Sequence, residues 1–297
     1  MRTGGHLRQP WGRRFAAALL PLLLAACQTP PVIEARPALW LVEDADTRIY
    51  LLGTMHALPA GTDWDGGKVA DAIRAADELM LELSPRELAA ASAVFDELAP
   101  RSTPLAMNAR LPAKALAGYR AIEGDDDLGG DALDDWAVLV MMGQRVAQRA
   151  DLSPADGVEA GLTAAFTRAG KPIGGLESAK AQLMLFETLD SATQRVLLVR
   201  AAENSARAES DVLAMTSAWS RGDTDALAKV VNEDVDGVPA ARKAIITERN
   251  RRWSSWVERR LDRPGTILMA VGAGHLVGAD SVPAMLAARG LKVARIQ

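Results

Sequence analysis

The sequence contains very little cysteine and no long apolar run. Cys27 is the single cysteine among 297 residues, which excludes a disulfide framework and a zinc site built from several thiolates. No apolar run reaches about 18 residues, so we expect no helix that spans a bilayer. A composition with 49% hydrophobic and 24% charged residues also excludes an intrinsically disordered chain. We therefore expect a folded protein.

Basic residues are scarce beyond the N-terminus. The chain has 34 Lys and Arg against 38 Asp and Glu, and four of the Arg lie within residues 1–26, which contain no acidic residue. The remainder holds 30 basic and 38 acidic groups, a net charge of −8. No patch dense enough for a phosphate backbone is left, so we expect no nucleic-acid partner.

The N-terminus has the pattern of an export signal. Arg13 and Arg14 precede an apolar stretch, residues 15–26, that ends in small residues, as in a secretory signal peptide. Leu24-Ala25-Ala26-Cys27 resembles the lipobox of bacterial lipoproteins, in which the cysteine becomes the lipidated first residue. We expect residues 1–26 to be removed, Cys27 to be lipidated and residues 27–37 to form a Pro-rich tether. Alternatively, Cys27 is only a small apolar residue of the signal region.

The residue after the cysteine bears on the compartment. It is Gln28 rather than Asp, and in resemblance terms this favours the outer membrane over the inner one. We therefore expect a lipid-anchored protein of the bacterial cell envelope that faces the periplasm and contacts the membrane through its anchor.

The rest of the chain predicts one domain, residues 38–297, of the α/β class, with α+β as the alternative. Apolar, β-prone runs predict strands at both ends of this domain, and helical spacing dominates between them. We expect a central sheet with a helical insertion. The predicted strands are 38–42, 48–52, 78–83, 171–175, 265–271 and 291–296, and the predicted helices include 66–76 and 282–289.

Two histidines remain after the signal, and both follow a predicted strand. His56 lies three residues after Gly53, and His275 lies three residues after Gly272. Glycine allows a backbone bend that a side chain would block, and α/β sheets place ligands at the carboxyl ends of their strands. The pattern thus favours two Gly-x-x-His loops in one site. The alternative is two histidines satisfied by hydrogen bonds in unrelated loops.

Two carboxylates and one arginine are the other candidates. Glu82 lies on an otherwise apolar strand, and Glu177 follows a Gly pair at the predicted start of a helix. Buried Glu needs a partner, although Glu82 could also be exposed at a sheet edge and Glu177 could complement a helix dipole. Arg249 lies in a charged helical stretch, where charge is usually a solvated face.

These motifs together resemble the TraB/GumN family. The resemblance rests on Gly53-Thr-Met-His56 with Trp64, the Glu82 strand, Gly175-Leu-Glu177 with Gln182, Glu248-Arg-Asn250, and Gly272-Ala-Gly-His275. That family is similar to the Tiki metallopeptidases and more distantly to erythromycin esterases and the haem-binding ChaN lipoprotein. The resemblance implies that the two loops face one another, with Glu82, Glu177 and Arg249 around them. Glu159 stands where the family commonly has Asp, which puts any role of that carboxylate in doubt.

The leading hypothesis is a metal-dependent hydrolase that acts on a peptide or protein substrate. His56, Glu82 and His275 would bind Mn²⁺, Co²⁺ or Zn²⁺, Glu177 would transfer a proton, and Arg249 would bind a substrate carboxylate or an oxyanion. The alternatives are a non-catalytic lipoprotein that binds a peptide, or haem through His56 or His275, and an envelope scaffold. The sequence leaves the substrate, the metal and the oligomeric state open.

Overall fold

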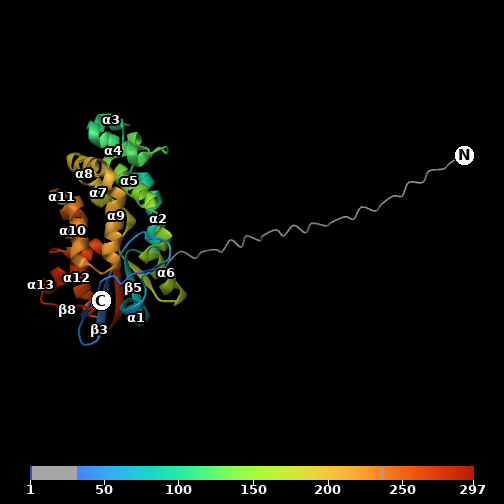
Figure 1. Ribbon diagram of the computed structural model, residues 1–297. Coiled ribbons are helices and arrows are strands. Elements are labelled where there is room, and N and C mark those ends of the chain that lie inside the picture. Colours follow the sequence, from blue (N-terminus) through green and yellow to red (C-terminus); the bar gives the residue numbers. More distant parts are fainter. Residues whose placement is uncertain (2–31, 236) are drawn as a thin grey trace. The chain divides into compact units, whose positions relative to one another are not determined.

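The computed structural model describes residues 1, 32–235 and 237–297. Within residues 32–297, a six-stranded mixed sheet carries helices on both faces, and a group of further helices lies beyond the sheet (Figure 1). Its strands β6, β5, β7 and β3 are parallel, and β2 is antiparallel to both of its neighbours. In spatial order they are β6 (Ile173–Glu177), β5 (Glu78–Leu83), β7 (Gly265–Gly272), β3 (Thr47–Thr54), β2 (Leu39–Glu43) and β8 (Val293–Arg295).

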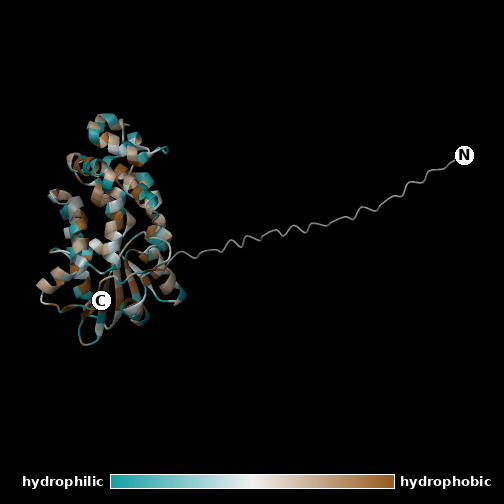
Figure 2. Ribbon diagram, in the orientation of Figure 1, coloured by the Kyte–Doolittle hydropathy of each residue, from teal (hydrophilic) through white to brown (hydrophobic). Residues whose placement is uncertain are grey.

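Both faces of the sheet are buried because its central strands are apolar throughout. On β7, Met269 packs in one hydrophobic core and the next residue, Ala270, in the other, since successive side chains point to opposite faces. Helices α12 (Glu248–Leu261) and α13 (Val282–Ala288) cover the first face, and α1 (Gly67–Ala75) and α6 (Val158–Arg168) cover the second. Figure 2 shows these strands as a hydrophobic band between helices whose outer turns are hydrophilic.

The remaining helices form the predicted insertion, which has a hydrophobic core of its own. Tyr119, Met142 and Leu198 are buried in it, and Figure 1 shows α3, α4, α5 and α8 at the end distant from β3 and β8. Most of these helices lie between β5 and β6 or between β6 and β7 in sequence. They are α2 (Pro85–Leu98), α3 (Met107–Arg110), α4 (Ala113–Glu123), α5 (Asp135–Arg149), α7 (Ala179–Glu187), α8 (Ser191–Glu203), α9 (Ser205–Ser220), α10 (Thr224–Val235) and α11 (Pro239–Arg242), with short helical turns η1 (Gly130–Ala132) and η2 (Pro154–Asp156) and a π-helical turn η3 (Lys243–Thr247).

The α/β class, the first hairpin and the helical insertion are therefore confirmed, whereas some strand boundaries were wrong: the strand expected at residues 291–296 is β8, Val293–Arg295. The strand expected at residues 171–175 is β6, which begins two residues later. Lys171 Nζ donates to the carbonyls of Arg74 and Ala76, at 2.9 and 2.6 Å, so this residue attaches the segment before β6 to the C-terminal end of α1. Glu177 consequently ends β6 and does not begin a helix. Helix α7 starts at Ala179, where Ser178 Oγ accepts from the Ala181 amide.

The expected tether also differs in its described part. Ile33–Glu34 form strand β1, which pairs in parallel with β4 (Thr62–Asp63), and Ala35 is fully buried. Residues 33–37 therefore contact the domain through backbone hydrogen bonds and through buried Ala35 and Pro37, which a Pro-rich composition did not predict. Cys27 and the signal segment lie outside the described residues.

Candidate functional site

The two Gly-x-x-His loops leave neighbouring strands at the same end of the sheet. Strands β3 and β7 are parallel, and Thr54 lies opposite Gly272 in their register. His56 and His275 follow these strands, so the two loops lie next to each other at one end of the sheet, as expected. Strand β5 contributes Glu82 and β6 contributes Glu177, so four adjacent parallel strands supply the candidate residues.

Glycine serves these loops by its small size and not by the expected backbone bend. Neither Gly53 nor Gly272 has a positive φ. A Cβ on Gly53 would lie 3.0 Å from both Cα and Cβ of Ala273, so the glycine lets the second loop approach the first closely. The Gly53 carbonyl also accepts a 2.8 Å hydrogen bond from Nε1 of buried Trp219, which fixes the end of β3.

His56 is held by a carboxylate that the sequence left in doubt. Nδ1 of His56 donates to Oε1 of Glu159 at 2.6 Å, and Thr54 Oγ1 donates to the same oxygen at 2.5 Å. Glu159 lies in the first turn of α6, whose N-terminal amide, Val158 N, donates to the Met55 carbonyl. The charge of Glu159 raises the pKa of His56 to about 9. The His56 side chain is 73% exposed, so its Nε2 is open to ligands from solvent.

Glu82 is a buried carboxylate with partners at both oxygens. Oε1 accepts from the Gly272 amide at 2.7 Å, and Oε2 accepts from Gln182 Nε2 at 2.8 Å and from Nη2 of Arg249 at 2.6 Å. Burial is the largest single influence and disfavours the charged form, but Arg249, the two histidines and the Gly272 amide together outweigh it and lower the pKa of Glu82 to about 2. The sequence alternative of an exposed edge side chain is therefore wrong for Glu82.

Arg249 connects the two carboxylates. It lies on α12 and is 5% exposed, and besides Glu82 it binds both oxygens of Glu177, at 2.8 to 3.2 Å. Its guanidinium carbon lies 4.6 Å from the ring centroid of Trp253, one turn further along the helix, in a cation–π contact. Arg252 also donates to Glu177, at 3.1 Å. Arg249 is thus a site residue and not part of a solvated helix face.

His275 is buried and differs from His56 in every contact. It lies in the short helical turn η4 (Ala273–Leu276) and is 6% exposed. Nδ1 lies 2.7 Å from Oδ1 of Asn250, and Nε2 lies 2.9 Å from Nη1 of Arg249. Burial lowers the pKa of His275 to about 3, so the ring is neutral.

A small cradle at Gly272 tests whether these residues fit a metal ion. A Cβ on Gly272 would lie 3.1 Å from Glu82 Oε1, 3.6 Å from Cδ2 of His275 and 3.9 Å from Nε2 of His56. Two of these neighbours are ligand atoms of the imidazole and carboxylate types that suit Mn²⁺, Co²⁺ or Zn²⁺. Across residues 1, 32–235 and 237–297, no three His, Cys, Asp or Glu side chains are close enough to hold an ion. Only His56 and Glu82 therefore fit an ion. His275 could bind it only if Arg249 released the hydrogen bond to Nε2 of His275.

Several site residues have weak sequence signals. Thr54, Gln182 and Asn250 stand in the family-like motifs but carry no charge, and Trp253 is one of seven Trp. Glu159 has the clearest signal, an acid in the first turn of a helix that begins at a Gly. A Cβ on that glycine, Gly157, would lie 2.2 Å from the His56 carbonyl oxygen, so the loop and the helix are in direct contact.

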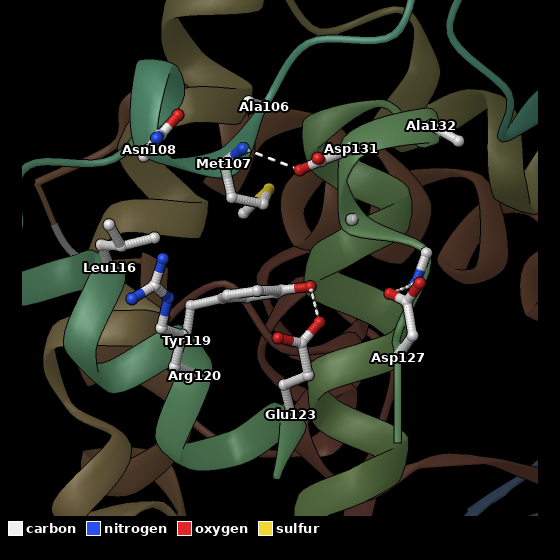
Figure 3. Close-up of a pocket in the computed structure, with 12 residues that line it drawn as sticks. Ala106, Met107, Asn108, Leu116, Tyr119, Arg120, Glu123, Asp127, Asp131 and Ala132 are labelled. Atoms are coloured by element: carbon white, nitrogen blue, oxygen red, sulfur yellow. Dashed lines mark hydrogen bonds between the residues drawn. The ribbon is translucent and has the colours of Figure 1, made fainter. Parts of the chain in front are cut away.

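A separate cavity contains none of these residues. It has a volume of about 340 Å³ and lies in the helical insertion, between α4 and the segment around η1 (Figure 3). Glu123 and Asp131 line it, but Glu123 accepts from the Tyr119 hydroxyl, and Asp131 Oδ1 accepts from the Met107 amide at 2.8 Å. These acids stabilise the local loops, and none of the candidate residues lines the cavity.

Comparison with known proteins supports one assignment. A model of the TraB/PrgY/gumN family matches residues 38–295, a range that contains all the candidate residues named above except Cys27. No curated protein and no solved structure matches the chain. In the part of the chain that the structure describes, no helix is long and apolar enough to cross a membrane.

Proposed function

The chain belongs to the TraB/PrgY/gumN family, and from this premise we propose that it is a metal-dependent hydrolase that acts on peptide bonds. The single observation that carries the proposal is the arrangement of His56. Glu159 binds its Nδ1, which leaves Nε2 on the same side of Gly272 as Glu82 Oε1. Metal-binding histidines commonly donate their other ring nitrogen to a carboxylate in this way.

The ion would be held by His56 Nε2 and Glu82 Oε1. When bound, it would polarise a substrate carbonyl and acidify a water molecule. Glu159 orients the His56 ring and holds the proton on Nδ1, so Nε2 is the nitrogen that would give up its proton to bind an ion.

Arg249 can bind a substrate oxygen with little rearrangement. Its Nε and Nη2 groups donate to Glu82 and Glu177 at 2.6 to 3.2 Å, and Nη1 donates to His275 at 2.9 Å. The remaining contact, from Nη1 to the carbonyl of Ile245, is 3.5 Å long and is the weakest of the set. A substrate carboxylate or a developing oxyanion can replace this carbonyl without breaking an ion pair.

For Glu177 we propose a different role from the one that the sequence suggested. Both of its oxygens accept from Arg249, and Oε1 also accepts from Arg252 at 3.1 Å. Two guanidinium groups occupy its oxygens and the side chain is only 5% exposed, so a substrate has little access to it. We propose that Glu177 positions Arg249, and that loss of Glu177 acts on turnover through this arginine.

The cellular setting belongs to the same proposal. The Leu-Ala-Ala-Cys27 sequence and Gln28 support a lipid-anchored protein of the outer membrane that faces the periplasm, with a peptide or protein as its substrate. The membrane contact would be the lipid at Cys27.

A non-catalytic lipoprotein that binds a peptide or haem is the second candidate. The 73% exposure of His56 favours it, because an exposed imidazole is open to a haem iron or a ligand. His275 is less suitable for haem, since its Nε2 accepts from Arg249.

Metal analysis of the purified protein, paired with cleavage of a peptide library, tests the proposal. We expect a divalent ion, cleavage that chelation removes and the ion restores, and loss of both ion and cleavage in His56→Ala. A folded protein that cleaves nothing at any metal loading would favour the binding lipoprotein. The exposed Glu209→Gln in α9 serves as the control and should behave as the wild type.

A further inference from the structure

Strand β6 is a free edge of the sheet that leads into the candidate site. In the described part of the chain, β6 pairs with β5 on one side and with no strand on the other. Its sequence, Ile-Gly-Gly-Leu-Glu, contains neither the Lys nor the Pro that commonly protect such edges, and Gly175 is exposed. Unpaired backbone groups at an open edge can accept an additional strand.

Helix α12 lies along the face of the sheet next to this edge. Arg252, Trp256 and Arg260 follow one another at intervals of four residues, so they lie on one face of the helix. Trp256 and Arg260 line a cavity of about 290 Å³ together with Arg263, Pro264, and Glu78 and Met80 of β5. Leu176 of β6 packs in the same hydrophobic core as Met80 and Trp256. We call this surface, formed by Arg252, Trp256, Arg260, Arg263, Met80 and the edge of β6, the β6 groove.

Two glycines leave the edge without large side chains. A Cβ on Gly174 would lie 2.6 Å from Cε of Met80, and a Cβ on Gly175 would lie 2.6 Å from the Ser84 amide nitrogen. Glycine is therefore required for the close packing of β6 on β5. The same absence of side chains leaves the backbone of β6 accessible at its centre.

The groove is basic on an otherwise acidic protein. Three Arg of the groove, Arg252, Arg260 and Arg263, outnumber the one acidic residue of its cavity, Glu78, whereas the chain beyond residue 26 carries a net charge of −8. The Arg252 side chain is 54% exposed and Arg263 is exposed, so both can reach a ligand. Charge complementarity thus favours an acidic occupant.

We propose that an extended, acidic segment of the substrate docks in the β6 groove as an additional strand on β6. The inference rests on the proposed hydrolase function, because β6 ends at Glu177, which binds Arg249. Backbone hydrogen bonds to β6 hold the segment, Trp256 and Met80 contact its apolar side chains, and Arg252, Arg260 and Arg263 bind its acidic ones. The protein thereby selects substrates by a segment that it does not cleave.

The sheet geometry sets the distance between recognition and cleavage. An added strand lies three strand positions from β7, which ends at Gly272, and neighbouring strands are about 4.8 Å apart. The peptide therefore crosses about 14 Å of the sheet edge, which takes about four extended residues. Cleavage is expected about four residues from the docked segment.

Direct binding tests the inference without any need for turnover. The probe is a fluorescent peptide of about eight alternating Val and Glu residues, a common strand length, and the full chain is treated with chelator. We expect binding that N-methylation of alternate probe residues abolishes and that replacement of Glu by Lys abolishes. Arg260→Glu and Arg263→Glu should each weaken binding by about fivefold or more, whereas Arg259→Glu, the same charge change outside the groove, should leave it within about twofold.

The outcomes separate this inference from the hydrolase proposal. Probe binding that responds to Arg263→Glu supports the groove even if the metal-loaded protein cleaves no peptide. Binding that His56→Ala removes but Arg260→Glu and Arg263→Glu leave intact would overturn the groove and keep the site. Equal binding of the N-methylated probe, or a dimer of the free protein that the probe cannot dissociate, would also overturn it.

Discussion

Nη1 of Arg249 donates a hydrogen bond to Nε2 of His275 across 2.9 Å, and this contact fixes the state of the imidazole. Arginine has no acceptor, so Nε2 must be the unprotonated nitrogen, and Nδ1 donates its proton to Oδ1 of Asn250. A proton added to this ring would face the guanidinium group directly. The two histidines of the site therefore have opposite responses to pH.

The first prediction concerns stability in acid. The pKa of His275 is about 3 in the folded protein against about 6.5 in the unfolded chain, so the unfolded chain binds the additional proton at higher pH. The neutral His275 ring therefore stabilises the folded protein above pH 6.5. This contribution to the free energy of unfolding is lost as the pH falls toward 3, by at most about 1.4 kcal/mol per pH unit. We expect chelator-treated wild type to lose stability more steeply than His275→Gln between about pH 6.5 and 4. Urea unfolding at a series of pH values measures this, and an equal decrease of the free energy of unfolding in the two proteins would contradict it.

Gly272→Ala tests the cradle. The added methyl group would lie 3.1 Å from Glu82 Oε1 and 3.9 Å from His56 Nε2, while the backbone of Gly272, with φ −46°, accepts an alanine. We expect a folded protein whose metal affinity is lower by about tenfold or more, measured by titration calorimetry. Gly143→Ala is the matched control, because no atom lies within 4 Å of its Cβ, and it should stabilise α5 by up to about 1 kcal/mol. Unchanged metal binding in Gly272→Ala would place the ion elsewhere.

Glu159→Gln tests whether the orientation of the His56 ring contributes to metal affinity. The amide cannot accept the Nδ1 proton of His56 as strongly as the carboxylate does, so the ring loses its fixed orientation. Loss of such a partner typically lowers metal affinity by about 10-fold to 100-fold, and we expect a decrease in this range. Glu209→Gln should leave the affinity unchanged. An equal affinity in both variants would mean that Glu159 has only a structural role.

Arg249→Leu should destabilise the whole domain. The substitution leaves Glu82 and Glu177 buried beside each other, with side-chain exposures of 9% and 5%, and removes their common partner. Breaking a buried ion pair in this way costs about 3–5 kcal/mol, which chemical unfolding measures directly. Arg259→Leu, on the exposed side of the same helix, should change stability by less than about 0.5 kcal/mol. A loss of similar size in both variants would show that the ion pair is not what stabilises the site.

Cys27→Ser tests the anchor. Without the thiol no lipid can be attached, so we expect the variant to lose palmitate labelling and to leave the membrane fraction. The labelling and fractionation of the wild type are the reference. A Cys27→Ser protein that remains labelled and membrane-bound would exclude the lipoprotein signal.

Local sequence predicts the parts of this fold that depend on neighbouring residues. The β-prone runs gave the strands, and the repeated strand-Gly-x-x-His pattern predicted two loops at one sheet edge, because parallel strands end at the same edge. Glu82 was predictable as a buried carboxylate because its strand is apolar. The need for a residue without a side chain at Gly53 was not predictable, because it depends on how closely Ala273 approaches.

The contacts between distant elements could not be predicted. Arg249 meets Glu82 across 167 positions of sequence, and apart from the family-like Glu248-Arg-Asn250 motif nothing in its charged helix distinguishes it from Arg251 or Arg252. The difference between exposed His56 and buried His275 depends on the packing of Trp253 against the second ring, with 4.6 Å between their centroids. Such contacts require the position of α12 on the sheet, which no local pattern contains.

The pairing of Thr54 with Gly272 has a consequence for biosynthesis. A polypeptide leaves the ribosome from its N-terminus, so His56 and Glu82 emerge long before β7, Arg249 and His275. Until β7 emerges, no strand lies between β3 and β5, and His56 and Glu82 lack Arg249 and His275. A truncated translation product therefore has no assembled site and exposes the edges of β3 and β5 that β7 covers in the complete domain, which makes it a substrate for quality-control proteases.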